Sequence, residues 1–252
     1  PDTTAGETNN GIVRVFEYDS DNNQFDQVGG NIVGYNGTYS AVNALNGDGS
    51  IIAIGAPNYA HSGYSGAGVV RVYKYDGSQW NQYGNDILDP DIIISNRYFS
   101  NSLDINYSGD IVVVGRWDTD QTATVYVFEY NSSTNIWDQK GTKIQGVTDY
   151  STYGDYFGYS VGINYYGTRV IVGAPNDDNN GNQSGSVEIY DYNSNTNTWN
   201  KIGQTINGTT GDSGSTDTAA FFGSSVSINK NSDPSIDGLS LIHISEPTRH
   251  SA

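Results

Sequence analysis

The segment Val125-Tyr-Val-Phe-Glu-Tyr130 has three near copies elsewhere in the chain, which start at residues 13, 70 and 187. These copies read Val13-Arg-Val-Phe-Glu-Tyr18, Val70-Arg-Val-Tyr-Lys-Tyr75 and Val187-Glu-Ile-Tyr-Asp-Tyr192. Successive starts are 57, 55 and 62 residues apart. The β-branched and aromatic residues of these copies are typical of a β-strand. The chain is therefore an array of repeats, and the repeat decides its fold.

Other segments recur with the same period. An aromatic residue and, four positions later, a glycine follow each copy: Phe25 and Gly29, Trp80 and Gly84, Trp137 and Gly141, Trp199 and Gly203. β-Branched runs precede three of the copies, at residues 51–57, 111–115 and 170–175. Further upstream lie related segments at residues 40–43, 99–103, 157–161 and 222–226. Glycine-containing turns separate these last two kinds of segment, so each unit predicts a meander of four short strands.

Four-stranded repeats of this length are typical of the blades of a β-propeller. The β-branched runs are continuous rather than alternating, which indicates strands that are buried on both faces. A blade that lies between two other blades buries its inner strands in this way. We therefore predict an all-β fold, a β-propeller of four-stranded blades. A solenoid of β-hairpins and a two-sheet sandwich are the alternatives, but neither accounts as readily for four similar strands in each repeat.

Residues 1–238 are predicted to form a single β-propeller fragment with three whole blades, at about 37–84, 98–141 and 156–203. Partial blades are expected at 11–30 and 221–238. Propellers close with about four to eight blades. Either the last partial blade closes a four-bladed ring with the first, or the parent protein has more blades, which we favour. The chain starts at Pro1 and contains no Met, so we expect it to be part of a longer protein.

Residues 239–252 form a separate tail. Its segment 239–249, Leu-Ser-Leu-Ile-His-Ile-Ser-Glu-Pro-Thr-Arg, resembles the translation of a sequencing-library adapter. We expect this tail to be non-native and leave it out of the analysis of the fold. Two of the three histidines, His243 and His250, lie in it.

Charge and composition exclude several classes of function. The chain has 11 Lys and Arg against 28 Asp and Glu, a formal net charge of −17, so we predict no nucleic-acid partner, because phosphate binding needs clustered cations. No run of about 18 apolar residues is present, so no membrane span is expected in this fragment. Cysteine is absent, which excludes disulfides and thiolate chemistry.

Motif residues add a family resemblance. Phe157-Gly-Tyr-Ser-Val161 with Gly173-Ala-Pro175 resembles the FG-GAP repeat of integrin α-chain propellers, and Phe222-Gly223 and Gly55-Ala-Pro57 repeat its two halves. The pattern is broken twice: Phe99-Ser100 replaces the first pair, and Gly115-Arg-Trp117 replaces the second triplet. The Trp-x-x-x-Gly strand is more similar to FG-GAP-like repeats of bacterial and algal surface proteins. The resemblance implies a seven-bladed extracellular or cell-surface propeller that serves adhesion or ligand binding.

The family also implies calcium in a loop between the first two strands, and Ca²⁺ requires six to eight oxygen ligands. The candidates here are Asn46 and Asp48 in one loop and Asp104 and Asn106 in the next. The carboxylate that would complete each shell is absent, so a plain hairpin turn is favoured. A separate acidic loop, 176–182, offers Asp177, Asp178 and Asn180, although such loops are more often simply solvated. We expect no other cofactor.

Candidate catalytic residues are scarce. Outside the tail, His61 is the one remaining histidine. No nucleophile or acid–base motif accompanies it, so we predict that the chain is not an enzyme. Two aromatic residues are candidates for ligand binding. Trp117 replaces the proline of the family triplet, and Tyr64 lies in a loop of small residues. Packing between blades is the competing explanation for both.

The sequence therefore predicts a non-catalytic propeller module that binds an extracellular protein or glycan through loops at one face. A second hypothesis is a structural scaffold attached to a hydrolase-like catalytic domain that is missing from this fragment. The predicted location, outside the cell or at its surface, rests mainly on the family resemblance.

Overall fold

The computed structural model describes residues 11–34, 42–116, 123–146, 154–209 and 220–231, and every structural statement below concerns these residues. Their regular structure is entirely antiparallel β-strand. In this part of the chain no helix is long and apolar enough to span a membrane. The strands form one hairpin and three larger sheets, and each of these four units is called a blade.

The blades follow one another in chain order. Blade 1 contains β1 (Ile12–Asp19) and β2 (Gln24–Val33). Blade 2 contains β3 (Val42–Leu45), β4 (Ile51–Gly55), β5 (Val69–Tyr75), β6 (Trp80–Gln82) and β7 (Ile87–Leu88). Blade 3 contains β8 (Phe99–Ile105), β9 (Ile111–Arg116), β10 (Thr124–Asn131), β11 (Ile136–Gln139) and β12 (Ile144–Gln145). Blade 4 contains β13 (Ser160–Ile163), β14 (Arg169–Ala174), β15 (Ser186–Asn193) and β16 (Thr198–Asn207).

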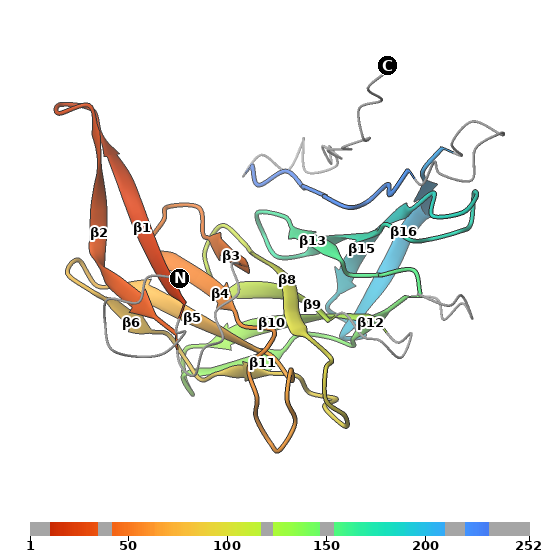
Figure 1. Cartoon of the computed structure of the whole chain (residues 1–252), viewed down its shortest axis with the longest axis horizontal. Coiled ribbons are helices and arrows are strands. Elements are labelled where there is room, and N and C mark those ends of the chain that lie inside the picture. The colour runs from red at the N-terminus through yellow and green to blue at the C-terminus, as the bar shows by residue number, and fades with distance from the viewer. Residues whose placement is uncertain (1–10, 35–41, 117–122, 147–153, 210–219, 232–252) are drawn as a thin grey trace.

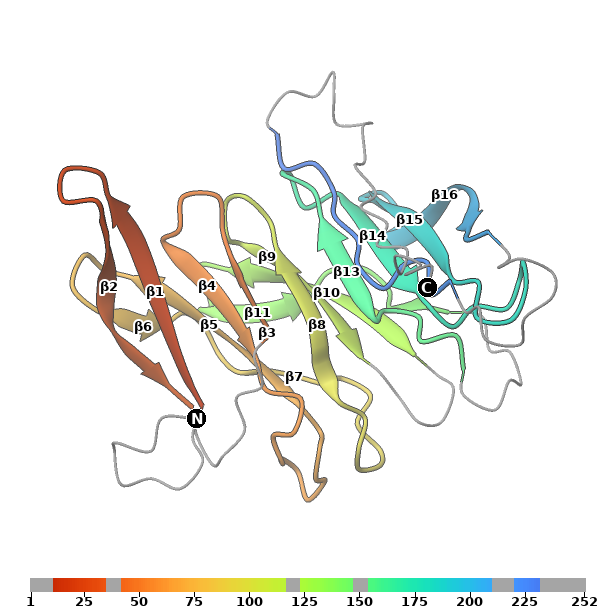
Figure 2. The ribbon, with the colours of Figure 1, turned by 45° about the horizontal axis from the view of Figure 1, so that its top comes forward.

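The blades stand side by side along an open arc, from β1 and β2 at one end to β15 and β16 at the other (Figures 1 and 2). Each larger sheet has meander topology, in the order β3-β4-β5-β6, β8-β9-β10-β11 and β13-β14-β15-β16. The innermost strands of neighbouring blades contact one another, β3 with β8 and β8 with β13. This arrangement confirms the predicted all-β propeller fold.

The hydrophobic core lies between the blades. All residues of β4 and β9 are buried, as the continuous β-branched runs predicted. Alternate side chains of the third strand point to opposite neighbours: Val70 and Val72 of β5 pack in one cluster with Tyr126 and Phe128 of blade 3. Tyr73 of the same strand packs instead with the hairpin of blade 1. No blade therefore buries its own two faces, and each depends on its neighbours.

The repeated tryptophan links each blade to the one before it. The Trp137 indole Nε1–H donates to the Tyr83 carbonyl at 2.7 Å, and its ring lies over Gly84. A side chain at Gly84 would lie 2.6 Å from this ring, and the positive φ of 86° at Gly84 also favours glycine. The equivalent residues Trp80 and Trp199 donate to carbonyls of blades 1 and 3 at 2.9 and 2.8 Å. In blades 2 and 3 the tryptophan of this motif thus contacts the preceding blade, and its glycine contacts the following blade.

The Phe-Gly pairs and the Gly-Ala-Pro triplets also meet between blades. Gly173 of blade 4 lies against the Gly223 carbonyl of the following segment, so that any side chain at Gly173 would overlap it. Gly115 of blade 3 lies in the same way against the Gly158 carbonyl, and the Gly158 N–H donates to the Gly173 carbonyl at 3.0 Å. These glycines are required because backbone approaches backbone at this point.

The outermost strand extends beyond the glycine of the motif, which the sequence analysis did not predict. In blades 2 and 3 the extensions are β7 and β12, which pair with the start of β5 and β10. In blades 1 and 4 the long strands β2 and β16 do the same through a register shift. A buried or half-buried isoleucine lies three residues after each glycine: Ile32, Ile87, Ile144 and Ile206. This Gly-x-x-Ile spacing is a signal that repeat comparison could have used.

Trp137→Ala should lower the free energy of unfolding by about 3–5 kcal/mol, because it removes a large buried ring. Trp137→Phe should cost only about 1 kcal/mol, because it removes the hydrogen bond but keeps an aromatic ring. Urea unfolding of the two variants beside the unchanged chain measures both values. A cost below about 1 kcal/mol for Trp137→Ala would contradict a core role for this ring.

Ser100→Gly should raise the free energy of unfolding by about 1 kcal/mol. Ser100 has a φ of 74°, whereas the equivalent residues Gly158 and Gly223 have φ of 82° and 88°. Its hydroxyl is buried and has no hydrogen-bond partner among the described residues. The same urea measurement tests this, with Gly158→Ser as the reverse change that should destabilise. A loss of stability for Ser100→Gly would show that packing of the hydroxyl outweighs the backbone strain.

Candidate functional site

The two faces of the arc differ in the connections between strands that they carry. On one face, called the loop face, the connections are long and include residues 56–68, 89–98 and 175–185. On the opposite face, called the turn face, the inner hairpins close through residues 46–50, 106–110 and 164–168. Figure 2 shows the loops that follow β4 and β7 projecting beyond the sheets. Since binding residues concentrate on loops held by a rigid scaffold, the loop face is the candidate site.

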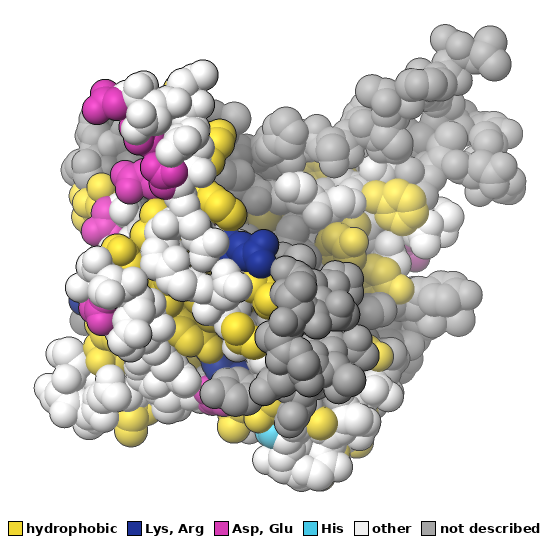
Figure 3. Space-filling model, turned by 60° about the vertical axis from the view of Figure 1, so that its left-hand side comes forward, with side chains coloured by type: hydrophobic (Ala, Val, Ile, Leu, Met, Phe, Trp, Pro, Cys, Tyr) yellow, Lys and Arg dark blue, Asp and Glu magenta, His cyan; other side chains and the backbone are white. Residues whose placement is uncertain are grey.

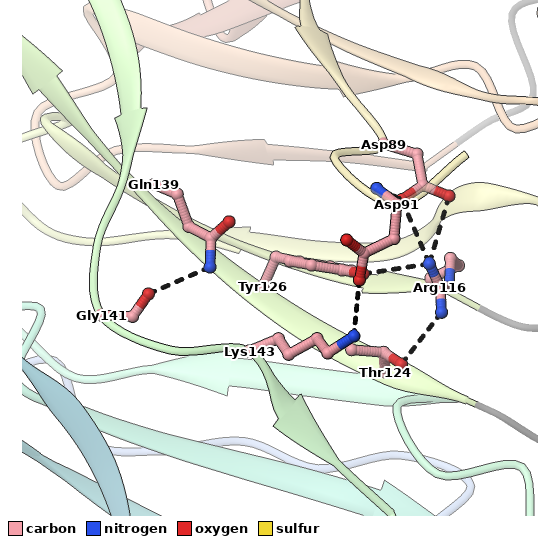
Figure 4. Close-up of polar contacts among 8 residues, drawn as sticks. All are labelled: Asp89, Asp91, Arg116, Thr124, Tyr126, Gln139, Gly141 and Lys143. Atoms are coloured by element: carbon pink, nitrogen blue, oxygen red, sulfur yellow. Dashed lines mark hydrogen bonds and ion pairs between the residues drawn. The ribbon is translucent and has the colours of Figure 1, made fainter. Parts of the chain in front are cut away.

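A buried charged cluster lies at the loop face between blades 2 and 3 (Figure 4). Arg116, at the end of β9, contacts both carboxylate oxygens of Asp89 at 3.1 and 3.3 Å. Both side chains are almost inaccessible to solvent, at 2% and 0%. The guanidinium also donates to the Tyr126 hydroxyl at 3.0 Å and to the Thr124 hydroxyl at 3.1 Å. These bonds partly offset the large cost of removing two charges from water.

A second, more exposed ion pair continues the cluster. The Tyr126 hydroxyl donates to Asp91 at 2.9 Å, and Lys143 contacts the same carboxylate oxygen at 2.6 Å. The hydrogen bond from Lys143 holds the pKa of Asp91 below its usual value, and burial raises the pKa of the Tyr126 phenol. Tyr126 therefore remains a neutral group whose hydroxyl accepts from the Arg116 guanidinium and donates to the Asp91 carboxylate.

Two departures from the repeat lie in this cluster, and a third lies outside it, against blade 2. Arg116 stands where the other units have Ala56 and Ala174, and Asp89 stands where they have Gly146 and Gly208. The third departure is Ser100, which replaces the motif glycine and lies beside Gly55. Sequence analysis noted the departures at residues 100 and 116 but not the one at Asp89, and it did not predict that Asp89 and Arg116 form an ion pair. Asp89 could have been found by comparing the residues two positions after the isoleucine of each Gly-x-x-Ile segment.

This cluster anchors loop 89–98. Asp89 and Asp91 hold its first residues against blade 3. At its far end, the N–H groups of Asn96 and Arg97 donate to the carbonyls of Ser65 and Gly66 in the neighbouring loop, at 2.8 and 3.0 Å. Ile93 lies between the two anchors and is 66% exposed. The loop thus presents an apolar side chain from a backbone that is fixed at both ends.

The neighbouring loop carries one of the predicted binding residues. Tyr64 is half-buried and exchanges backbone hydrogen bonds with His61 at 2.9 and 3.1 Å. The His61 ring stacks on Tyr59 with centroids 6.2 Å apart, and the Arg71 guanidinium lies 5.0 Å from the Tyr59 centroid. The other predicted binding residue, Trp117, lies outside the described residues.

The acidic loop 176–182 is also on the loop face, but its oxygens have partners within the protein. Asp177 accepts the backbone N–H two residues later at 2.7 Å and contacts the Ser186 hydroxyl. Asp178 accepts a backbone N–H five residues later at 2.6 Å. The Asn180 amide donates to the Gly208 carbonyl at 2.7 Å. These contacts order the loop without bringing its carboxylates to one point.

The remaining predicted calcium residues lie toward the turn face. The Asn46 side-chain oxygen accepts the N–H of Ile51 at 2.9 Å, and that of Asn106 accepts three successive N–H groups at 3.0–3.1 Å. Asp48 accepts the N–H and hydroxyl of Ser50 at 2.9 and 2.6 Å. Each of these oxygens closes its own hairpin turn, which is a common use of Asn and Asp.

Asp104 has a different role from the other three. It faces Lys230, whose Nζ lies 2.6 Å from one carboxylate oxygen, and its second oxygen accepts the Ile163 N–H at 3.0 Å. It therefore joins blade 3 to blade 4 and to the segment 220–231. Among the described residues no three His, Asp or Glu side chains are grouped so that they could hold a metal ion. Most of the candidate residues instead accept hydrogen bonds from their own loop or from Lys230, as in a structural turn or an ion pair.

An open hollow of about 330 Å³ lies away from the loop face. Its lining comes from the outer hairpin of blade 3: Glu129, Tyr130, Asn131, Ser132, Asp138 and Gln139. Polar, solvent-filled depressions of this kind lack the apolar lining that is usual in ligand pockets. The hollow is therefore not the candidate site.

Asp89→Gly should lower the free energy of unfolding by about 3–5 kcal/mol, because it leaves the buried Arg116 guanidinium without its counter-charge. The double change Asp89→Gly with Arg116→Ala introduces the residues that the other units carry, and should recover a large part of this loss. Thermal or urea unfolding of both variants and of Arg116→Ala alone measures the coupling. Simple additivity of the two single changes would contradict the proposed pairing.

Comparison with known proteins adds a family to this description. Residues 149–190, which contain Phe157-Gly158 and Gly173-Ala-Pro175, match the family model of the FG-GAP repeat. No curated protein matches the chain. A solved structure named "putative 6-phosphogluconolactonase" from Bacteroides uniformis is similar over 79% of this chain, with a TM-score of 0.53 and 13% identity. At this identity the similarity shows the fold alone, and the chain spans 49% of that structure's length.

The β-propeller domain of the Trilobed protease from Pyrococcus furiosus also matches, with a TM-score of 0.38 and 11% identity over 80% of this chain and 54% of that one. The matched repeat, the recurrence of its motif residues along the chain and the fold lead to one assignment: the chain contains an FG-GAP repeat at residues 149–190 within a β-propeller fold.

Proposed function

We propose that the chain is a non-catalytic module of an extracellular or cell-surface protein, and that it binds a protein or a glycan through its loop face. The observation that carries this proposal is the anchored loop 89–98. A loop held at both ends loses little conformational freedom when a partner binds, so more of the contact energy is available for affinity.

Further exposed side chains on the same face support a binding role. Tyr159 precedes β13 and stacks on Tyr156, with ring centroids 6.3 Å apart. Phe221 lies in the segment after β16 and is also exposed. Tyrosine offers a large contact area at low entropic cost and is suited to protein and sugar surfaces. The net charge of −17 favours neutral or basic partners over sulfated or phosphorylated ones.

A non-catalytic role is supported by the surroundings of His61. Its Nδ1 lies 3.2 Å from the Ser62 hydroxyl, but the two residues are neighbours in one turn. Its Nε2 has no hydrogen-bond partner in the described part of the chain. A hydrolytic triad needs a third group to orient the histidine. The extracellular location is supported by the FG-GAP resemblance. The lack of cysteine is compatible with it, because the contacts between repeats, rather than disulfides, hold the fold together.

Tyr159→Ser combined with Ile93→Ser should reduce binding at least about tenfold, because it removes two exposed apolar contacts from the loop face. Tyr166→Ser is the matched control: Tyr166 and Tyr159 are both 44% exposed, but Tyr166 lies in a turn of the opposite face. The readout is binding of the labelled chain to a panel of neutral, sialylated and sulfated glycans and to immobilised extracellular-matrix proteins.

Loss of binding in the control alone would place the site on the turn face and contradict the proposal. Absence of binding to every member of the panel would favour the alternative, a scaffold beside a catalytic domain. The expected pattern is binding to neutral or basic members that only the loop-face variant loses.

A further inference from the structure

The turns that close the inner hairpins lie in a row on the turn face (Figure 2). The residue after the first asparagine of each turn is Gly47 in blade 2, Tyr107 in blade 3 and Tyr165 in blade 4. The Gly47 N–H donates to the Tyr107 carbonyl at 2.9 Å, and the Tyr107 N–H donates to the Tyr165 carbonyl at 3.4 Å. These hydrogen bonds bring one position of the repeat together across three blades.

The Tyr107 ring lies between the two neighbouring turns. It packs so closely on Gly47 that a side chain at that position would come within 2.0 Å of the ring. Toward blade 4 it stacks on Tyr165, with ring centroids 4.4 Å apart and ring planes inclined by 24°. Tyr107 is nonetheless 40% exposed, and Tyr165 is half-buried. The stacked pair is therefore fixed in position and still accessible from solvent.

Composition makes tyrosine the main oxidisable side chain of this chain. Oxidation of proteins most commonly acts on Cys and Met, and the chain contains neither, whereas it contains 20 Tyr. The three described tryptophans, Trp80, Trp137 and Trp199, are half-buried or buried between blades. A tyrosine that loses one electron and one proton becomes a phenoxyl radical, and two such radicals in contact join through their rings.

We propose that Tyr107 and Tyr165 are a site of oxidative cross-linking, at which a dityrosine bond joins blades 3 and 4. The oxidant is hydrogen peroxide, used by a haem peroxidase. Each phenol gives up one electron and one proton, and a C–C bond forms between the ring carbons next to the two C–O carbons. The hydrogens on these two carbons then move to the phenol oxygens. The two electrons and two protons that were removed reduce one peroxide to two waters.

Another pair of tyrosines is as close but is less suited to oxidation. Tyr83 and Tyr130 stack between blades 2 and 3 with ring centroids 3.9 Å apart. The Lys74 ammonium lies 5.3 Å from the centroid of Tyr83 and opposes the loss of an electron from this ring. Burial also raises the pKa of Tyr83 to about 12, which opposes the loss of its proton.

Exposure alone does not select a pair. Exposed hydrophobic side chains, a class that includes tyrosine, are scattered over the face shown in Figure 3. Tyr18, Tyr159 and Tyr166 are each more exposed than Tyr107. In the described part of the chain, however, their recorded ring contacts are with residues of their own blade. Tyr107 and Tyr165 combine exposure with a stacked partner from another blade.

The bond would act as a covalent link in a chain that has no cysteine for disulfides. Tyr107 and Tyr165 lie about one repeat apart in the sequence, so the link closes a long loop. Such a link restricts the unfolded chain far more than the native one, as a disulfide does in the chain-entropy account. The site lies on the turn face and does not rest on the proposed function of the loop face.

Oxidation of the full chain at low concentration, with a haem peroxidase and hydrogen peroxide, tests the proposal. Monomeric chain should gain dityrosine fluorescence and lose the mass of two hydrogen atoms. Proteolysis and mass spectrometry should then give one cross-linked pair of peptides, which contains Tyr107 and Tyr165. The oxidised chain should also unfold at a higher urea concentration than the untreated chain.

Three single variants and a control separate position from composition. Tyr107→Phe and Tyr165→Phe should each lose the cross-link, because phenylalanine forms no phenoxyl radical. Gly47→Ala keeps both tyrosines but places a methyl group against the Tyr107 ring, so it should lower the yield. Tyr166→Phe is the matched control: Tyr166 is 44% exposed and meets Tyr165 edge-on at 4.8 Å, and its loss should leave the yield unchanged. Urea unfolding before oxidation shows that each variant is folded.

Four outcomes would overturn the proposal. The first is a folded chain that forms no dityrosine. The second is a cross-linked peptide that joins Tyr83 to Tyr130 or Tyr165 to Tyr166 instead. The third is an equal yield from the unchanged chain and from Tyr107→Phe. The fourth is dityrosine in dimers alone, which would show that the bond forms between molecules.

Discussion

The contact between the tryptophan of one blade and the glycine of the preceding blade is the constraint on which the structure depends. The indole ring needs a position without a side chain beneath it, and its N–H needs a carbonyl that no β-ladder uses. Glycine at positive φ supplies both, because it turns the strand and leaves its surface bare. Since blades 2 and 3 each provide the ring for one neighbour and the glycine for the other, stability resides in the interfaces rather than in any single blade.

Local sequence patterns predicted the four-stranded blades because the patterns are repeated along the chain. Continuous β-branched runs correctly indicated the buried strands β4 and β9, and the aromatic–glycine spacing correctly indicated an outer strand. The short strands β7 and β12 were missed because two residues carry no periodicity of their own. Asp89 was missed for a different reason: its partner Arg116 belongs to another blade, and pairing between blades cannot be derived from spacing along one strand.

Candidate metal residues show the limit of reasoning from residue type. Asn and Asp supply calcium ligands, but they also close turns by accepting backbone N–H groups. Asn46 and Asn106 occupy the same place in their hairpins, and in both the side-chain oxygen accepts the N–H groups of its own turn. The sequence left both alternatives open, a plain turn and a binding loop, and the direction of these oxygens favours the turn.

The charged cluster connects the frame to the candidate site. A buried ion pair seldom adds stability over a well-packed apolar pair, so Arg116 and Asp89 are costly replacements for the alanine and glycine of the other units. What they add is position: Asp89 and Asp91 fix the start of loop 89–98 on blade 3, and the neighbouring loop holds its end. Arg116 and Asp89, which depart from the repeat, therefore hold the loop that carries the exposed Ile93. A surface organised in this way binds with less loss of entropy than a free loop, which is why the loop face, rather than any acidic turn, is the better place to seek a partner.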